Sequence, residues 1–197
     1  MSSREKILGA ISSNKPVFIE SPVVEIDRFQ IEPATALAQF TQTLVSIGGT
    51  VVQVSDMHLI GDEIKKARDS GKYVVNTLPF LGEVNEEINV SLDATALESV
   101  HQAYIGATLG VAENGAVWIY ESQMKNRLLP FICQHLVICM RSKDIVPTMH
   151  EAYQQIDVFK EGYGVFLAGP SKTADIEQSL VIGAHGARSL LVYLINE

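Results

Sequence analysis

Three consecutive stretches decide the fold class: Thr50-Val-Val-Gln-Val-Ser55, Leu59-Ile-Gly-Asp-Glu-Ile-Lys-Lys-Ala-Arg68 and Tyr73-Val-Val-Asn76. The first and third are short and rich in valine, which is typical of buried strands. The middle stretch has apolar residues at helical spacing and is followed by Gly71, a residue that often ends helices. Strands that alternate with helices predict a parallel or mixed sheet covered by helices.

The same alternation continues on both sides of this unit. Upstream, Pro33 opens a predicted helix that ends at Gly48-Gly49. Downstream, 80–93 reads as a loop, 104–120 as strand, turn and strand, 124–131 as a helical turn, 135–140 as a buried strand, 147–157 as a helix, 164–168 as a strand, 172–182 as a helix and 189–195 as a strand. We therefore expect one α/β domain with a mixed, mainly parallel sheet covered by helices.

The N-terminal part has a different character. Ser2 and Glu5 have the spacing of a capping box, which predicts a short helix, and 14–31 reads as an extended arm. The expected division is a helix and arm over 1–32 and an α/β domain over 33–197. The arm has few local ways to bury its apolar side chains, so a homodimer in which a second copy buries them is a possible arrangement. These side chains are Val17, Phe18, Ile19, Val23 and Val24.

Composition excludes several classes of function. The 197 residues carry a formal net charge of -8, which argues against nucleic-acid binding. No leader-like or membrane-spanning apolar stretch is present, so a cytoplasmic protein without membrane contact is expected. If 131–139 is a strand, Cys133 and Cys139 lie about 20 Å apart. They can then share neither a disulfide nor a metal, and the chain has no iron–sulfur ligand set. The histidines lack ligand spacing, so we assign no metal and no cofactor.

The segment Gly169-Pro-Ser-Lys-Thr-Ala-Asp-Ile-Glu177 follows a predicted strand and opens a predicted helix. Ser171 is a natural helix cap, and Lys172 and Thr173 follow it in the first turn. Free backbone N–H groups here can hold an anion. Asp175 and Glu177 favour the helix dipole but oppose an anionic ligand. On this motif alone, a well-capped helix without a ligand is therefore the favoured interpretation.

Two shorter segments add candidate residues. Glu113-Asn114-Gly115 has the strongest short hairpin signal in its Asn-Gly pair. The alternative makes Glu113 a carboxylate that enters a cleft and serves as a general acid or base. His185 and Gly186 follow the predicted helix end, where a lone histidine is more often structural than catalytic.

Taken together and in this order, these three segments resemble the signature of the LUD-domain family, in particular its lactate-utilisation C proteins. The resemblance covers roughly residues 35–195 and includes Arg127-Leu-Leu-Pro130. The chain departs from the family pattern at Asn114, where threonine is usual, at Lys172, where arginine is common, and at Ala187, where proline follows the His-Gly pair.

The resemblance implies a fold like that of the ribose-phosphate isomerase and CoA-transferase superfamily. It also implies a subunit or accessory role in the oxidation of L-lactate to pyruvate, with iron–sulfur chemistry supplied by partner proteins. It makes ligand-binding candidates of Asn114, Gly115, Gly169, Ser171, Lys172, Thr173, Asp175, Glu177, His185 and Gly186. Two alternatives stay open: a stand-alone enzyme that uses Glu113 on a small phosphorylated or thioester metabolite, and a regulatory or scaffold protein.

Overall fold

The computed structural model describes residues 2–22, 32–85, 88, 92–172, 182–183 and 185–196. The predicted N-terminal helix is confirmed as α1 (Ser3–Ser13), and its capping box is present. Ser2 Oγ accepts from the Glu5 backbone N–H, and Glu5 Oε2 accepts from the Ser2 backbone N–H. Every residue of 2–22 is exposed, so α1 and the segment after it contribute nothing to a core. Part of the predicted arm, 23–31, lies outside the described residues.

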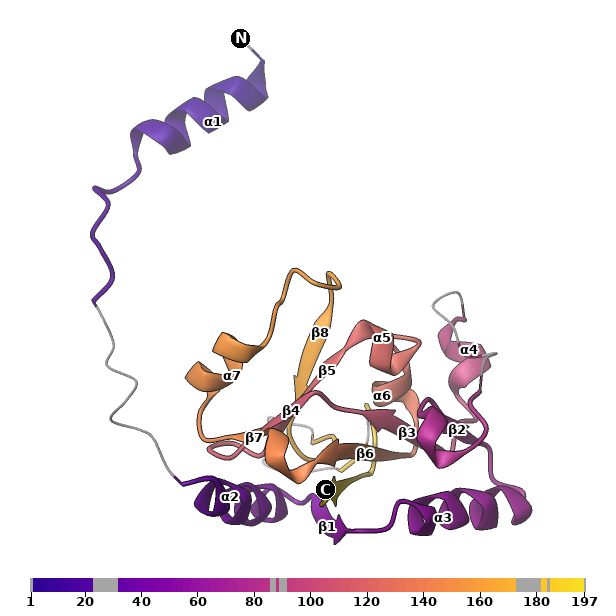
Figure 1. Cartoon of the computed structure of the whole chain (residues 1–197). Helices are drawn as coiled ribbons and strands as arrows, with labels where there is room; N and C mark the ends of the chain where they lie inside the picture. Colours follow the sequence, from indigo (N-terminus) through magenta and orange to yellow (C-terminus); the bar gives the residue numbers. More distant parts are fainter. Residues whose placement is uncertain are drawn as a thin grey trace.

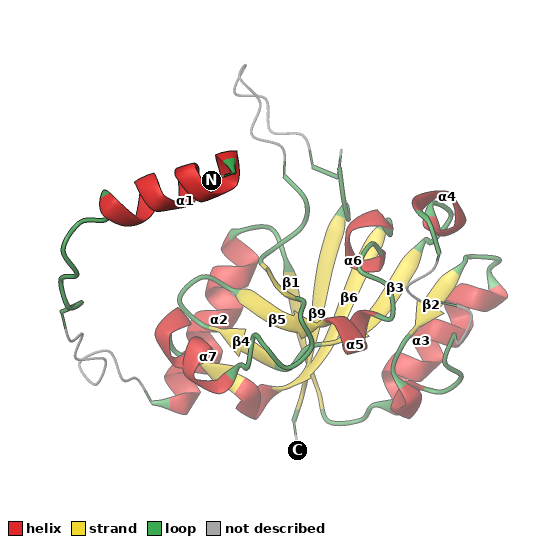
Figure 2. Cartoon of the chain, turned by 90° about the horizontal axis from the view of Figure 1, so that it is seen from above, coloured by secondary structure: helices red, strands yellow, loops and turns green. Residues whose placement is uncertain are grey.

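A five-stranded, wholly parallel sheet forms the centre of the domain, in the order β1-β9-β6-β3-β2 (Figure 2). The strands are β1 (Thr50–Val54), β2 (Val74–Asn76), β3 (Gln102–Gly106), β6 (His135–Arg141) and β9 (Ser189–Ile195). The middle strand β6 is buried on both faces, which explains its nearly unbroken apolar sequence.

Alternate residues of β6 enter two different apolar clusters. Val137 and Cys139 face the side of the sheet covered by α3 (His58–Asp69), together with Ile60 and Ile64 of that helix. Leu136, Ile138 and Met140 face the opposite side, where α2 (Pro33–Ser46) and a second sheet pack. This period of two is what a central strand requires when both of its faces are covered.

The second sheet has four strands in the order β7-β4-β5-β8, in which β5 is antiparallel to β4 and to β8, and β4 is parallel to β7. Its strands are β4 (Leu109–Val111), β5 (Ala116–Tyr120), β7 (Ile145–Val146) and β8 (Gly164–Leu167). The short helix α7 (Met149–Gln155) covers its outer face around Trp118 and Tyr120. The prediction of a mainly parallel α/β fold covered by helices is confirmed, with the antiparallel strands collected in a sheet of their own.

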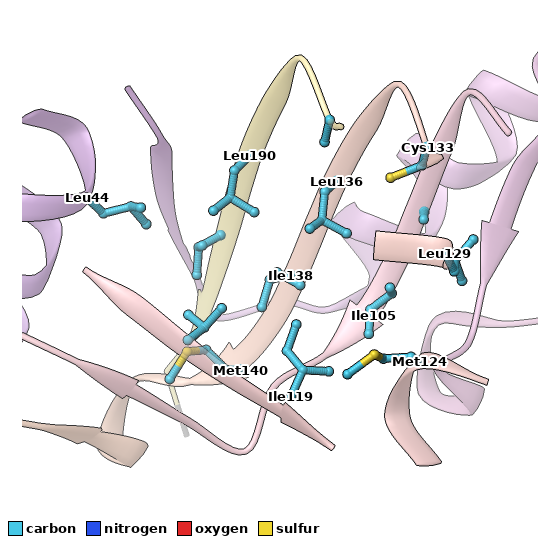
Figure 3. Close-up of a cluster of buried hydrophobic side chains, with 14 of the residues drawn as sticks. Leu44, Ile105, Ile119, Met124, Leu129, Cys133, Leu136, Ile138, Met140 and Leu190 are labelled. Carbon is cyan, nitrogen blue, oxygen red and sulfur yellow. The ribbon is translucent and has the colours of Figure 1, made fainter. Parts of the chain in front are cut away.

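The main core lies between the two sheets. Figure 3 shows Ile138 and Met140 on the parallel sheet and Ile119 on β5 of the second sheet reaching into the same space. Ile119 and Ile138 have no exposed surface, so both sheets share this one core. The rigid framework of the molecule is therefore the sandwich of two sheets, with α2 closing one side (Figure 1).

Some local predictions were wrong in detail. The expected helical turn over 124–131 is two short helices, α5 (Glu121–Met124) and α6 (Leu129–Ile132), separated by Lys125 at φ 63°. The helix expected from Pro147 begins only after Thr148, whose side chain caps it by accepting from the Glu151 N–H. The remaining short elements are η2 (Pro79–Leu81), α4 (Ala94–Leu97) and η3 (Ser142–Asp144).

Candidate functional site

The structure joins the second and third sequence segments through backbone hydrogen bonds. After β8, the chain turns at Gly169, whose φ of 74° suits glycine. A Cβ there would lie 3.0 Å from the Ile47 carbonyl oxygen at the end of α2. The Ser171 N–H then donates to the Ala187 carbonyl (2.9 Å), and the Gly183 N–H donates to the Ser171 carbonyl (3.0 Å). The loop after β8 and the segment before β9 are thus held side by side.

Five of the candidate residues line one cavity of about 260 Å³: Gly169, Ser171, Lys172, His185 and Gly186. Side chains of Phe131, Leu136, Phe166 and Leu190 supply much of its apolar wall. Gly186 allows the close approach, because a Cβ there would lie 3.0 Å from Ser171 Cβ. The cavity therefore combines an apolar interior with a hydroxyl, an ammonium group and an imidazole, the mixture of a small-molecule site.

The expected anion cradle differs from the prediction in one respect. The Ser171 N–H is already used, because it donates to Ala187 rather than pointing freely at a ligand. Thr173, Asp175 and Glu177 lie outside the described residues, as does most of the predicted 172–182 helix. At the two ends of that segment, Lys172 and Ile182 form an antiparallel bridge.

The cavity lies near the amino ends of strands in the parallel sheet. The loop at 169 does follow the carboxyl end of a strand, but that strand is β8 of the second sheet. Leu136 and Leu190, which line the cavity, are near the amino ends of β6 and β9. The rule that ligands bind outside the carboxyl ends of parallel strands therefore does not apply to this cavity.

Glu113, Asn114 and Gly115 form the turn of the β4–β5 hairpin. The Gly115 N–H donates to the Val111 carbonyl (2.9 Å), and Asn114 Oδ1 accepts from the Ala116 N–H (3.0 Å). Glu113 and Asn114 are exposed, and none of the three turn residues is among the residues that line the 260 Å³ cavity. This geometry favours the hairpin interpretation; the catalytic hypothesis for Glu113 stays a prediction.

The hairpin turn and the cavity loop nevertheless both pack against the carboxyl end of α2. A Cβ at Gly115 would lie 3.0 Å from the Leu44 backbone, and the Gly169 position lies equally close to Ile47. Leu44 and Ile47 are one turn apart at the carboxyl end of α2. The first and second sequence segments thus lie against this end of α2, and the second and third line the cavity.

A neighbouring cavity of about 390 Å³ shares Phe131, His185 and Gly186 with the first and adds Cys133 and Arg188. Burial raises the pKa of the Cys133 thiol to about 12, which keeps it protonated and unreactive near neutral pH. Phe131 and Arg188 line these cavities although neither was predicted from the sequence. Arg188 directly follows the Gly-rich segment, and this position was the signal that could have identified it. Phe131 lies on the separate helix α6, so its place in the sequence gave no such signal.

No metal centre emerges from the described part of the chain, which holds no group of three or more His, Cys, Asp or Glu side chains placed to share an ion. Within the same residues, no helix is both long enough and apolar enough to cross a membrane.

Comparison with known proteins supplies the family. The model of the LUD domain matches residues 25–195. The chain belongs to the LUD-domain family. The LUD domain thus accounts for both sheets and for both cavity-forming segments, which all lie within the matched range.

Curated relatives of this LUD domain include proteins named lactate utilization protein C. It is 30% identical over 121 residues to lactate utilization protein C of Bacillus pumilus (strain SAFR-032), a match that covers 58% of this chain and 49% of that protein. It is 32% identical over 127 residues to lactate utilization protein C of Geobacillus sp. (strain WCH70), covering 57% and 53%. The chain thus spans about half the length of the curated relatives that it matches.

A solved structure supports the fold of this LUD domain independently. A protein of the DUF162 family from Deinococcus radiodurans superimposes with a TM-score of 0.63 at 20% identity. The superposition covers 84% of this chain and 99% of the other. At that identity the likeness concerns the arrangement of helices and strands alone.

Proposed function

We propose that this LUD-domain protein is a cytoplasmic, ligand-binding accessory subunit of a system that oxidises L-lactate to pyruvate. The observation that carries the proposal is that two of the three sequence segments meet in one cavity, lined by Ser171, Lys172 and His185. Relatives that match over 57–58% of the chain bear the name lactate utilization protein C. The cavity would hold a small anionic metabolite, with Lys172 offsetting its charge.

In this proposal the electrons from lactate pass to iron–sulfur partner proteins. The protein itself has two cysteines, and both are buried with raised thiol pKa values of about 12. The surfaces open to such partners include the exposed apolar side chains of Val17, Phe18 and Ile19, which are 85–87% exposed. A second copy of this chain is the other occupant that we consider for that segment.

The test is genetic and biochemical together. Deletion of the gene should abolish growth on L-lactate and leave growth on pyruvate unchanged. Complementation with the wild type should restore growth, and a Ser171→Ala/Lys172→Ala variant should not. Lys143→Ala, which changes an exposed lysine outside both cavities, is the control variant and should behave as the wild type. Normal growth of the deletion strain, together with no iron–sulfur protein in the affinity-purified complex, would contradict the proposal.

Glu113→Gln separates this proposal from the stand-alone enzyme. Because Glu113 is an exposed turn residue, we expect the variant to complement fully and to change the free energy of unfolding by less than about 0.5 kcal/mol. Loss of lactate growth at an unchanged melting temperature would instead support Glu113 as an acid or base.

A further inference from the structure

A larger cavity, of about 540 Å³, lies at the opposite end of the parallel sheet. Its lining includes residues that end or directly follow the parallel strands: Met57, Leu78, Gly106, Arg141 and Ile195. This is the carboxyl edge of the sheet, the place where open α/β sheets bind ligands. None of the residues of the 260 Å³ cavity takes part, so the two cavities are separate sites.

The walls of this cavity are mostly apolar. Met57 and Phe80 in its lining are 40% and 50% exposed, whereas Leu78 is partly buried and Ile195 is buried. Side chains of this kind around a concave surface suit an apolar ligand, and a cavity of about 540 Å³ has room for an aromatic ring.

Gln123 places one hydrogen-bond donor in this wall. Its Oε1 accepts from the Tyr120 backbone N–H (2.8 Å) and from Thr108 Oγ1 (3.1 Å). A backbone N–H can only donate, so the orientation of the amide is fixed and Nε2 must point the other way. Nε2 lies 3.5 Å from where a Gly106 Cβ would be, and no described residue accepts from it.

The two charged residues of the lining, Arg141 and Asp144, pair with each other, so the cavity does not require a charged ligand. Arg141 donates to both carboxylate oxygens of Asp144, from Nε at 2.6 Å and from Nη2 at 3.1 Å. Each charge is thereby largely offset by the other. The neutral amide of Gln123 adds a hydrogen-bond donor to this wall that carries no charge, and such a donor matches a single carbonyl or carboxylate oxygen.

We infer that the carboxyl-edge cavity is a second binding site, for a small organic molecule with an apolar, ring-sized body and one carbonyl or carboxylate oxygen held by Gln123 Nε2. The site goes beyond the proposed role in lactate oxidation and does not depend on it. Lactate itself lacks the apolar body that Met57, Phe80 and Ile195 would contact.

The probes are 3-phenylpropionate and its uncharged amide, each titrated into ¹⁵N-labelled protein to about 10 mM, the range expected for fragments of this size. The Gln123 side-chain amide signals, assigned by their loss in Gln123→Glu, should shift with either probe. A shift with the carboxylate alone identifies an acid as the ligand class, and a shift with both identifies a carbonyl group.

Gln123→Glu is the decisive variant, because it keeps an oxygen for Tyr120 and Thr108 but replaces the free donor with an acceptor. Binding of 3-phenylpropionate, followed through the other shifted signals, should weaken by about tenfold or more. Gln154→Glu, an exposed change of the same charge on α7, should bind as the wild type.

Phe80→Ala provides a second test of the site, because it leaves the hydrogen bonds of Gln123 intact. It removes a half-exposed wall of the cavity, so it should weaken both probes without lowering the melting temperature appreciably. Unshifted Gln123 signals in the wild type, or binding that survives both Gln123→Glu and Phe80→Ala, would overturn the inference. Neither result would bear on lactate growth, which tests the other cavity.

Discussion

His101 and His135 form a pair whose titration the fold controls. Their ring centroids are 4.9 Å apart, and His135 Nδ1 lies 2.8 Å from Ser189 Oγ. Burial and then Lys72 lower the pKa of His101. For His135, burial lowers the pKa most, followed by His101, Lys72 and Arg188. The folded protein thus binds protons here less readily than the unfolded chain does.

The lowered pKa values of His101 and His135 determine how the free energy of unfolding depends on pH. Above the unfolded pKa of 6.5 both rings are neutral in both states, and their contribution is complete. As the pH falls through 6.5 towards the lower folded values, the unfolded chain takes up protons first and the free energy of unfolding decreases. Lys72→Ala should raise both folded pKa values in an NMR titration, whereas Lys143→Ala should leave them unchanged. Equal pKa values in wild type and Lys72→Ala would contradict this account.

Gly115 is a second position at which a single residue should affect the stability of the fold. Its φ is 69°, and a Cβ would lie 3.0 Å from two backbone atoms of Leu44. Gly115→Ala should therefore lower the free energy of unfolding by about 1–3 kcal/mol, measured in urea. Gly71→Ala is the matched control, because its φ is 80° but nothing lies within 4 Å of its Cβ position. Equal losses at the two sites would show that the contact with Leu44 costs nothing.

At the level of elements, the segment after α1 and the loop after α7 hold the two most exposed phenylalanines among the described residues. Phe18 is 87% exposed and Phe159 is 91% exposed, whereas Phe40 on α2 has no exposed surface. Chymotrypsin should cleave first after Phe18 and Phe159 and spare Phe40, as followed by intact-mass spectrometry. Early cleavage at Phe40 would contradict the burial of α2. Protection of Phe18 that grows with protein concentration would show that a second copy covers this segment.

Some helices and strands could be predicted from the sequence, whereas the sheet to which a strand belongs could not. Local signals were sufficient for the β4–β5 hairpin, whose Asn114-Gly115 pair has few other uses, and for the strands that are buried on both faces. They were not sufficient for β8. Its sequence reads like that of any buried strand, and only its pairing with β5 shows that it belongs to the second sheet.

The same limit applies to the sites. Ser171 and His185 are close in sequence to the glycines that bring them together, so their shared cavity could be expected. The carboxyl-edge cavity takes its residues from the ends of separate strands, with Gln123 added by α5. No local pattern connects them, because the parallel sheet alone makes them neighbours.

For the whole molecule, the shared core predicts a single unfolding transition. The only tryptophan, Trp118, lies in the second sheet, and Ile138 lies in the parallel sheet. Ile138→Ala should cost about 2–5 kcal/mol, because the side chain has no exposed surface. Trp118 fluorescence and far-ultraviolet circular dichroism should shift together in urea. Leu59→Ala, at a residue that is 58% exposed, should move neither curve appreciably. Two separate transitions would mean that the sheets unfold independently.

The position of β9 has a consequence for how the protein is made. β9 is the last described strand in the sequence, yet it lies between β1 and β6 and pairs with both. While the nascent chain is still leaving the ribosome, β1 has no strand beside it and its apolar face stays open. The parallel sheet can therefore close only after the ribosome has released residues 189–195, and until then β1 and β6 lack the strand that joins them.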